Sequence, residues 1–269
     1  DDIQALGIEG LQIGSDSKLV IKFPYLRRSY QSRRAVSDIL LEALPGTLTL
    51  ALSAMLFATV IGVLLGVLAA VKQNTWMDSS AVFASVLGIS APSFFMGIVI
   101  AYLFGFVLSA YTGLHMTGSL FAYDAFEGRQ LQLQNLILPA ITLGIRPLAI
   151  ITQLTRSAML DVLGQDYIRT AYAKGLRKSA VIFKHALRNA LNPVVTAITG
   201  WFAELLAGAF FVEYIFGWKG IGKITVDALE RLDFPVVMGS VLLTASFFVL
   251  VNLLADVFYG IIDPRARIF

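Results

Sequence analysis

Residues Gly46–Val71 read GTLTLALSAMLFATVIGVLLGVLAAV and contain no charged side chain. An uncharged apolar run of about 18 residues or more is the signature of a helix that crosses a lipid bilayer. The chain as a whole follows this trend, since 57% of its 269 residues are hydrophobic and only 14% are charged. Soluble domains carry about 25% charged residues. We therefore predict an all-α integral membrane protein.

Four more apolar segments follow this run, and each is long enough to cross a bilayer. They are residues 79–111, 131–155, 190–212 and 234–262. We interpret all five segments as membrane-spanning helices, so that residues 46–269 form one transmembrane domain. Residues 1–45 are polar and carry balanced charges, which excludes a spanning helix there.

Loop charges predict the orientation of these helices. Residues 156–189 contain seven basic and two acidic side chains, a net charge of +5, whereas residues 111–130 and 213–233 each have a net charge of −1. Cytoplasmic loops accumulate Lys and Arg, so we place residues 156–189 and the C-terminus in the cytoplasm. Five crossings then place residues 1–45 on the extracytoplasmic side. An outside N-terminus is explained if a sixth helix precedes Asp1, and we expect six helices in the intact protein.

Composition also limits the chemistry of the chain. There are no cysteines, which excludes disulfides and thiol catalysis, and the two histidines, His115 and His185, lie far apart. We predict no metal centre, no catalytic residues and no cofactor held by this chain. The net charge of +3 is interpreted as a topology signal of a membrane protein, and we expect no nucleic-acid partner.

The basic segment 156–189 has the pattern of an amphipathic helix. Gly175 is predicted to form a turn, because glycine accepts left-handed backbone angles. Beyond it, apolar residues recur at steps of three and four, which places them on one face. They are Leu176, Ala180, Phe183, Leu187 and Leu191, beside a stripe formed by Arg177, Lys184 and Arg188. Periodicity leaves two interpretations open, a helix lying on the lipid surface or a loop that binds a partner protein.

The same segment resembles the cytoplasmic loop of binding-protein-dependent ABC importer permeases, which has an alanine-rich stretch, then a glycine, then a proline. Here these positions are Ala171, Gly175 and Pro193. Thr170 stands where the family at large often has glutamate, and the dipeptide, oligopeptide and nickel branch commonly lacks that glutamate. The resemblance covers nearly the whole chain. Its other matching stretches are Leu44–Thr47, Ser90–Phe95, Phe216–Gly222 and Asp263–Arg265.

This resemblance implies a type I ABC importer transmembrane domain whose loop inserts into a groove of a separate ATPase subunit. The candidate coupling residues are Thr170, Ala171, Lys174, Gly175, Leu176, Arg177, Lys178, His185 and Pro193. The implied partners are a second similar permease, two ATPases that bind ATP and Mg²⁺, and an extracytoplasmic solute-binding protein. The implied location is a bacterial-type cytoplasmic (inner) membrane. Peptide, nickel and glutathione cargoes are not separated by the sequence.

The stretch Gly217–Lys223 nearly matches the sequence pattern of a phosphate-binding loop. The residue after its lysine must be Ser or Thr to reach magnesium, and here it is Ile224. We therefore predict no nucleotide site and no enzymatic activity, and we expect ATP hydrolysis on another polypeptide.

Three charged residues lie inside apolar segments, namely Arg146, Glu204 and Asp256. Charges at membrane depth usually face a bundle interior or a water path, so these residues either line the translocation pathway or have a structural role. Glu204 is the strongest pathway candidate because it lies in mid-segment. Pro92 is a candidate hinge, and the alternatives are a static kink or the start of a new helix after a break. The competing function is a secondary transporter driven by an ion gradient through Glu204 or Asp256.

Overall fold

The computed structural model describes residues 11–13, 17–19, 26–124 and 128–262. Helices account for most of these residues. The long helices are α1 (Val36–Val71), α2 (Trp76–Ser90), α5 (Gln134–Leu163), α8 (Leu187–Gly208) and α11 (Phe234–Ile262). The shorter helices are α3 (Ser93–Tyr102), α4 (Ser109–Thr112), α6 (Asp166–Ala173), α7 (Lys178–Ala180), α9 (Phe210–Ile215) and α10 (Ile221–Glu230), with π-helical turns η2 (Leu103–Val107) and η3 (Val181–Ala186). Two antiparallel hairpins pair β1 (Leu11–Ile13) with β2 (Ser17–Leu19) and β3 (Phe121–Asp124) with β4 (Gly128–Leu131).

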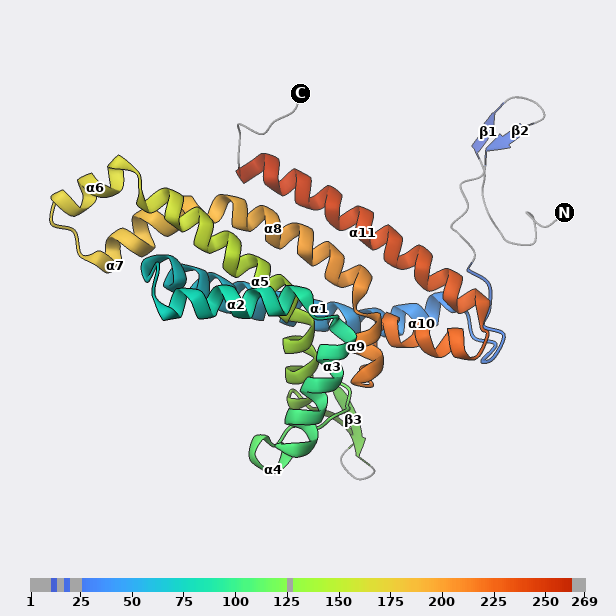
Figure 1. Ribbon diagram of the computed structural model, residues 1–269. Coiled ribbons are helices and arrows are strands. Elements are labelled where there is room, and N and C mark those ends of the chain that lie inside the picture. The colour runs from blue at the N-terminus through green and yellow to red at the C-terminus, as the bar shows by residue number, and fades with distance from the viewer. Residues whose placement is uncertain (1–10, 14–16, 20–25, 125–127, 263–269) are drawn as a thin grey trace.

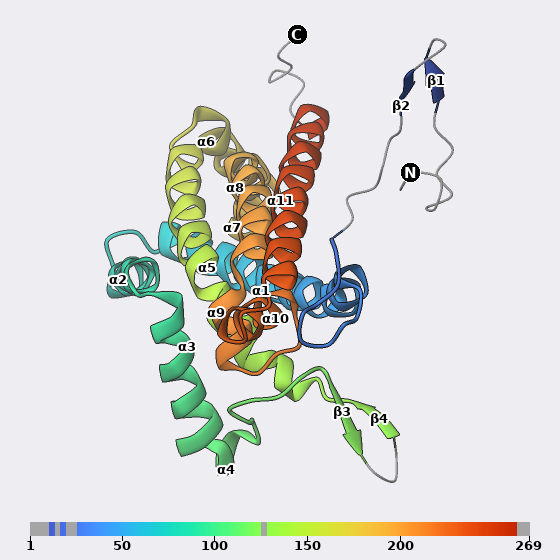
Figure 2. The same ribbon diagram turned by 90° about the vertical axis from the view of Figure 1, so that its right-hand side faces the viewer.

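Helices α1, α5, α8 and α11 pack together as a bundle (Figure 1). The α6–α7 segment forms one end of this bundle, and α10 lies at the other end. Helices α3 and α4 and the β3–β4 hairpin project from one side of the bundle, as both views show (Figures 1 and 2). This arrangement agrees with the prediction of an all-α membrane protein.

The predicted count of five spanning helices is met only in part. Among the described residues, α1, α5 and residues 234–255 of α11 are long and apolar enough to cross a membrane, and the α2–α3 pair adds a fourth span if it is counted as one. That pair is bent by 110° at the break after Ser90. Helix α8 covers most of predicted segment 190–212 and is not counted among these spans in the described part of the chain.

The first helix begins earlier than predicted. Residues 36–45 were expected to belong to the polar segment 1–45, yet α1 starts at Val36 and contains Pro45 in its interior. Proline removes one helical hydrogen bond. Burial compensates for this loss, because Val36 and Leu40 pack with residues of α10 and α11 in one apolar cluster. Residues 1–10, 14–16 and 20–25 of that polar segment lie outside the described residues.

Small residues allow α1 and α5 to approach closely. Gly62 and Gly66 on α1 face α5, where a Cβ on Gly62 would lie 2.9 Å from Ile151 Cγ2 and one on Gly66 2.5 Å from Thr155 Cβ. Gly144 on α5 is packed equally tightly, since a Cβ there would lie 2.8 Å from the carbonyl oxygen of Ala54. Close backbone approach through small residues is a main source of helix association in membranes. The α1–α5 contact is therefore the structural centre of the bundle.

Candidate functional site

The α6–α7 end of the bundle, which we call the knob (residues 166–186), contains the turn predicted at Gly175. The Gly175 N–H donates to the Tyr172 carbonyl at 2.9 Å, and the Leu176 N–H donates to the Ala171 carbonyl at 3.3 Å. Gly175 itself has a φ of +76°. These bonds form a Schellman motif, which ends a helix with a left-handed residue that is usually glycine. The predicted role of Gly175 as a turn between two short helices is confirmed.

The buried face of the knob lies beside the predicted apolar face. The structure buries Val181, Ile182, Ala186 and Ala190, which pack in one cluster with Val67 of α1, Met159 of α5 and Ile168 of α6. Of the residues predicted to share one apolar face, Leu176 and Phe183 are exposed, whereas Ala180, Leu187 and Leu191 are half-buried. The reason is that α7 starts only at Lys178 and residues 181–186 form a π-helix, so the spacing of a regular α-helix does not hold.

The exposed surface of the knob combines large apolar and basic side chains. Its apolar members are Tyr167, Tyr172, Leu176 and Phe183. Its basic members are Arg169, Lys174, Arg177, Lys178 and Lys184, and Arg188 follows just beyond it in α8. Aromatic residues and arginine are enriched at protein interfaces. The knob is thus a firmly anchored projection with a surface suited to binding a partner.

A second polar centre, at the opposite end of the bundle, surrounds Glu213. This carboxylate is 0% exposed, accepts a hydrogen bond from Thr47 Oγ1 at 2.7 Å and accepts another from the Lys223 N–H at 3.1 Å. Thr47 Oγ1 also accepts a bond from the Ile221 N–H at 2.8 Å. Glu213 therefore connects α1 to the start of α10 through a satisfied buried network.

The glycine-rich stretch 217–223 has its structural explanation here. The N–H groups of Lys223 and Gly222 donate to the carboxylate of Glu213 rather than to an external phosphate. Gly220 is packed against that carboxylate, and a Cβ on Gly222 would lie 2.5 Å from the Cα of Phe210. The Trp218 indole N–H donates to the Gly46 carbonyl at 2.9 Å. In the sequence Glu213 is one of the charges of the 213–233 loop, and its burial was not predicted because its partner Thr47 lies 166 residues away.

Glu213 predicts a pH-dependent stability. It lies on α9, outside the helices that meet the spanning criterion, and burial raises the pKa of its carboxyl from 4.5 to about 7. A carboxyl with a raised pKa binds its proton more tightly in the folded state, so stability falls as pH rises from about 4.5 to about 7 and is level above that. We expect a loss of about 3 kcal/mol over this range. Thermal unfolding of detergent-solubilised protein at pH 5–8 measures it.

The matched variant for this prediction is Glu213→Gln, which keeps the shape of the side chain and cannot ionise. Its unfolding temperature should lack the part of the pH dependence assigned to Glu213. Glu230→Gln, at an exposed position on α10, should retain the full pH dependence. Parallel pH profiles for Glu213→Gln and the unmodified protein would contradict the assignment.

An ion pair connects the beginning of α2 to α5. Arg156 donates from Nε to Asp78 Oδ1 at 2.5 Å and from Nη2 to Asp78 Oδ2 at 2.8 Å. Asp78 also accepts the Asn74 N–H at 3.0 Å, and Asn74 has a φ of +60°. In the sequence Arg156 is one of the seven basic residues of segment 156–189. In the structure its ion pair with Asp78 connects α5 to the turn between α1 and α2.

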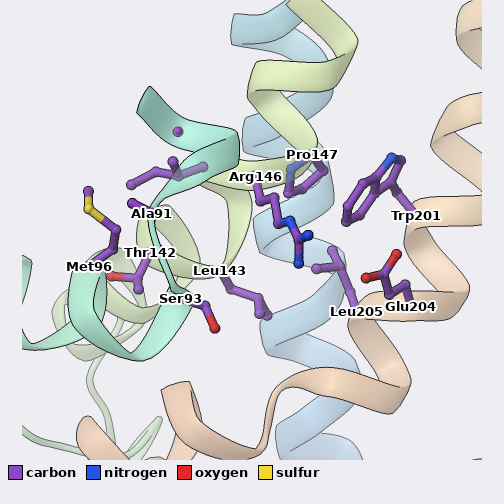
Figure 3. Close-up of a pocket in the computed structure, with 12 residues that line it drawn as sticks. Ala91, Ser93, Met96, Thr142, Leu143, Arg146, Pro147, Trp201, Glu204 and Leu205 are labelled. Carbon is purple, nitrogen blue, oxygen red and sulfur yellow. The ribbon is translucent and has the colours of Figure 1, made fainter. Parts of the chain in front are cut away.

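A cavity of about 70 Å³ lies between α3, α5 and α8 (Figure 3). It is lined by Arg146 of α5 and by Trp201 and Glu204 of α8, and the side chains of Arg146 and Glu204 point toward one another. The Arg146 guanidinium carbon lies 5.7 Å from the centroid of a Trp201 ring, a cation–π distance. Two of the three predicted pathway residues therefore meet at one cavity.

Comparison with known proteins decides the family. Residues 62–268 match the family described as "Binding-protein-dependent transport system inner membrane component". The chain belongs to this family. As a family member it is a permease component of a transport system of the inner membrane, which favours the importer hypothesis over the ion-gradient-driven alternative.

Relatives of this permease include two peptide permeases and a glutathione permease. The dipeptide transport system permease protein DppB of Escherichia coli K12 is 44% identical over 256 residues, covering 89% of this chain and 76% of its own. The di/tripeptide permease DppB of Pseudomonas aeruginosa is 42% identical over 258 residues, covering 90% of this chain and 76% of its own. The glutathione permease GsiC of E. coli K12 is 36% identical over 275 residues, covering 99% of this chain and 85% of its own.

Solved structures support the fold of this permease. A structure of the MetNI methionine ABC transporter in an inward-facing conformation matches with a TM-score of 0.65 at 16% identity, covering 84% of this chain and 97% of that one. The structure of an amino acid ABC transporter with histidines gives a TM-score of 0.61 at 13% identity, covering 89% of this chain and 99% of that one. The predicted ABC importer transmembrane fold is confirmed.

The remaining candidate residues of the permease are placed as follows. Pro92 precedes α3 at the 110° bend, so the predicted break is confirmed and the hinge role stays a prediction. Pro193 lies within α8, and His185 is half-buried in η3. Thr170 is exposed on α6 and bonds its hydroxyl to the Asp166 carbonyl at 3.0 Å. Asp256 belongs to α11, and its side chain lies outside the described part.

Proposed function

We propose that this permease forms half of the translocation pathway of an ATP-driven importer for peptides. The knob carries this proposal, because it is a rigid projection with an exposed apolar and basic surface. The names of the relatives, which are dipeptide, di/tripeptide and glutathione permeases, supply the solute class. ATP hydrolysis is proposed to occur on separate ATPase subunits, one of which receives the knob.

The anchoring of the knob suits it to transmit force. Val181 and Ala186 are fully buried, and their cluster includes residues of α1 and α5. A displacement of the knob by a moving ATPase would therefore act on the α1–α5 contact. Coupling in this scheme is energetic, since ATP binding favours one state of the bundle through contacts that differ between the states.

The complete importer is proposed to contain a second similar permease, two ATPases and an extracytoplasmic solute-binding protein. The charge of the 156–189 segment places the knob and the C-terminus in the cytoplasm in this proposal. Residues 1–45 and the Glu213 end of the bundle then face the opposite side, where the solute-binding protein docks.

Phe183→Asp tests the docking of the ATPase. Phe183 is 55% exposed on the knob, so an aspartate there places a charge in the interface without disturbing the core. We expect at least a tenfold loss of ATPase co-purification and of ATP-driven dipeptide uptake, since aromatic anchors at interfaces are worth about 2 kcal/mol or more. Pull-down of the ATPase and uptake into proteoliposomes measure the two effects.

Tyr111→Asp is the matched control, because Tyr111 is an 89% exposed aromatic residue of α4, away from the knob. It should bind the ATPase as the unmodified protein does. If Phe183→Asp also retains the ATPase and its uptake, the knob is not the docking site. Loss of binding to anionic vesicles by Phe183→Asp, with the ATPase retained, would instead favour the lipid-surface interpretation.

A further inference from the structure

The cavity between α3, α5 and α8 is lined by two side chains of opposite charge, Arg146 and Glu204. In the described part of the chain, neither Arg146 nor Glu204 forms an ion pair within 4.0 Å or a side-chain hydrogen bond. Arg146 contacts the Trp201 ring. Both charged side chains are exposed to the cavity and its opening. Charges within membrane helices usually lie on a substrate or ion path.

The rest of the cavity wall is small or apolar. Gly88, Ala91 and Ser93 border it where α2 bends into α3, and Leu143 and Leu205 close it from α5 and α8. The small residues leave space in front of the two charges (Figure 3). A volume of about 70 Å³ accommodates polar end groups, while the side chains of a solute would extend through the opening. The site thus offers strong polar contacts and little shape selection.

We propose that Arg146 and Glu204 form a contact site for the main-chain charges of a zwitterionic peptide, rather than for its side chains. The guanidinium of Arg146 binds the terminal carboxylate, for which its planar fork is well matched. The carboxylate of Glu204 binds the terminal ammonium group of the peptide. The Trp201 ring makes a cation–π contact with the Arg146 guanidinium. This inference rests on the proposed function, because it assumes that peptides cross the bundle at this cavity.

A site of this kind suits a transporter of varied peptides. Every unblocked peptide carries the two terminal charges, whatever its side chains are. A pair that reads only these charges lets diverse solutes pass while giving each a favourable contact within the membrane. The competing explanation is that Arg146 and Glu204 pair with each other in another state of the transport cycle and never touch solute.

Binding of blocked and free peptides separates these explanations. The importer is assembled with its partner subunits in lipid nanodiscs, without the solute-binding protein, and titrated with Ala-Ala, its C-terminal amide and its N-acetyl derivative. The readout is tryptophan fluorescence, with the signal of a Trp201→Phe importer subtracted. We expect Arg146→Gln to weaken Ala-Ala binding about tenfold or more and to change binding of the amide less than about twofold. Glu204→Gln should likewise weaken Ala-Ala binding about tenfold or more, and it should change binding of the N-acetyl derivative, which lacks the ammonium group, less than about twofold.

The outcomes that overturn the inference are distinct. Equal losses for free and blocked peptides would indicate an internal ion pair, and the absence of a Trp201-dependent response to Ala-Ala would exclude the site. As a control, Arg231→Gln replaces an exposed charge just beyond α10 and should leave the binding of free and blocked peptides unchanged. If a charge variant does not assemble, Ser93→Phe decides, since it keeps both charges and fills the cavity. The Ser93→Phe importer should lose the Trp201-dependent fluorescence response to Ala-Ala, and a retained response overturns the proposal.

Failure of the proposed function gives a different result. ATP-driven uptake of Ala-Ala by the unmodified importer with its solute-binding protein is measured first. If uptake is absent, the peptide-permease proposal fails. If uptake occurs while binding is insensitive to Arg146 and Glu204, only this inference fails.

Discussion

Gly66→Leu should prevent the bundle from folding to a stable state. A Cβ at Gly66 would lie 2.5 Å from Thr155 Cβ and 2.7 Å from the Thr152 carbonyl oxygen, so α1 and α5 would have to separate. Overpacking a filled core typically costs about 1–3 kcal/mol, and here the obstacle includes rigid backbone. We expect a loss of about 3 kcal/mol or more. Thermal unfolding in detergent, with size-exclusion chromatography to detect aggregation, measures this loss.

Gly200→Leu provides the control for this prediction. Gly200 also lies in a helix, α8, but a Cβ there meets no atom within 4 Å. Substitution at this position should be neutral or slightly stabilising, because glycine in a helix costs about 0.5–1 kcal/mol relative to alanine. Gly66→Ala should fall between the two leucine variants. If Gly66→Leu and Gly200→Leu had equal effects, the α1–α5 contact would not be the centre of the fold.

Sequence patterns predicted the features that depend on local chemistry. The bounds predicted for the last helix, 234–262, are those of α11, because an apolar run with the single charge of Asp256 begins and ends there. The turn at Gly175 follows from the backbone freedom of glycine, and the break at Pro92 from its missing N–H. The early start of α1 was missed, because Val36 and Leu40 are buried by elements more than 180 residues away in the chain.

Features that depend on long-range contacts were not predicted. The predicted apolar face of the knob is divided between exposed and half-buried residues, because a π-helical turn changes the spacing of its residues. The burial of Glu213 depends on Thr47, which belongs to a different helix. The spacing of Ala58, Gly62 and Gly66 is the small-residue repeat of closely packed membrane helices. It indicates a close helix contact on this face of α1, and the structure shows that α5 makes this contact.

Asp78→Ala should destabilise the permease strongly by leaving two groups without a partner. Arg156 would lose both of its bonds to the carboxylate while only 26% of its side chain reaches solvent. The Asn74 N–H would lose its acceptor at a position of positive φ. Removing one partner of a buried ion pair costs about 3–5 kcal/mol, and the partial exposure of Arg156 places the expected loss near the lower limit, about 3 kcal/mol.

The double variant Asp78→Leu/Arg156→Leu distinguishes the pair from the packing around it. Replacing a buried ion pair by apolar residues of similar size is often neutral, so the double variant should recover most of the unfolding temperature lost by Asp78→Ala. Arg156→Leu alone should remain destabilised, because it leaves Asp78 buried and charged. If the double variant is as unstable as Asp78→Ala, the ion pair is required for the α1–α2 turn itself. Because α2 leads from this turn to the bend beside the Arg146 cavity, such a result would also predict impaired peptide binding there.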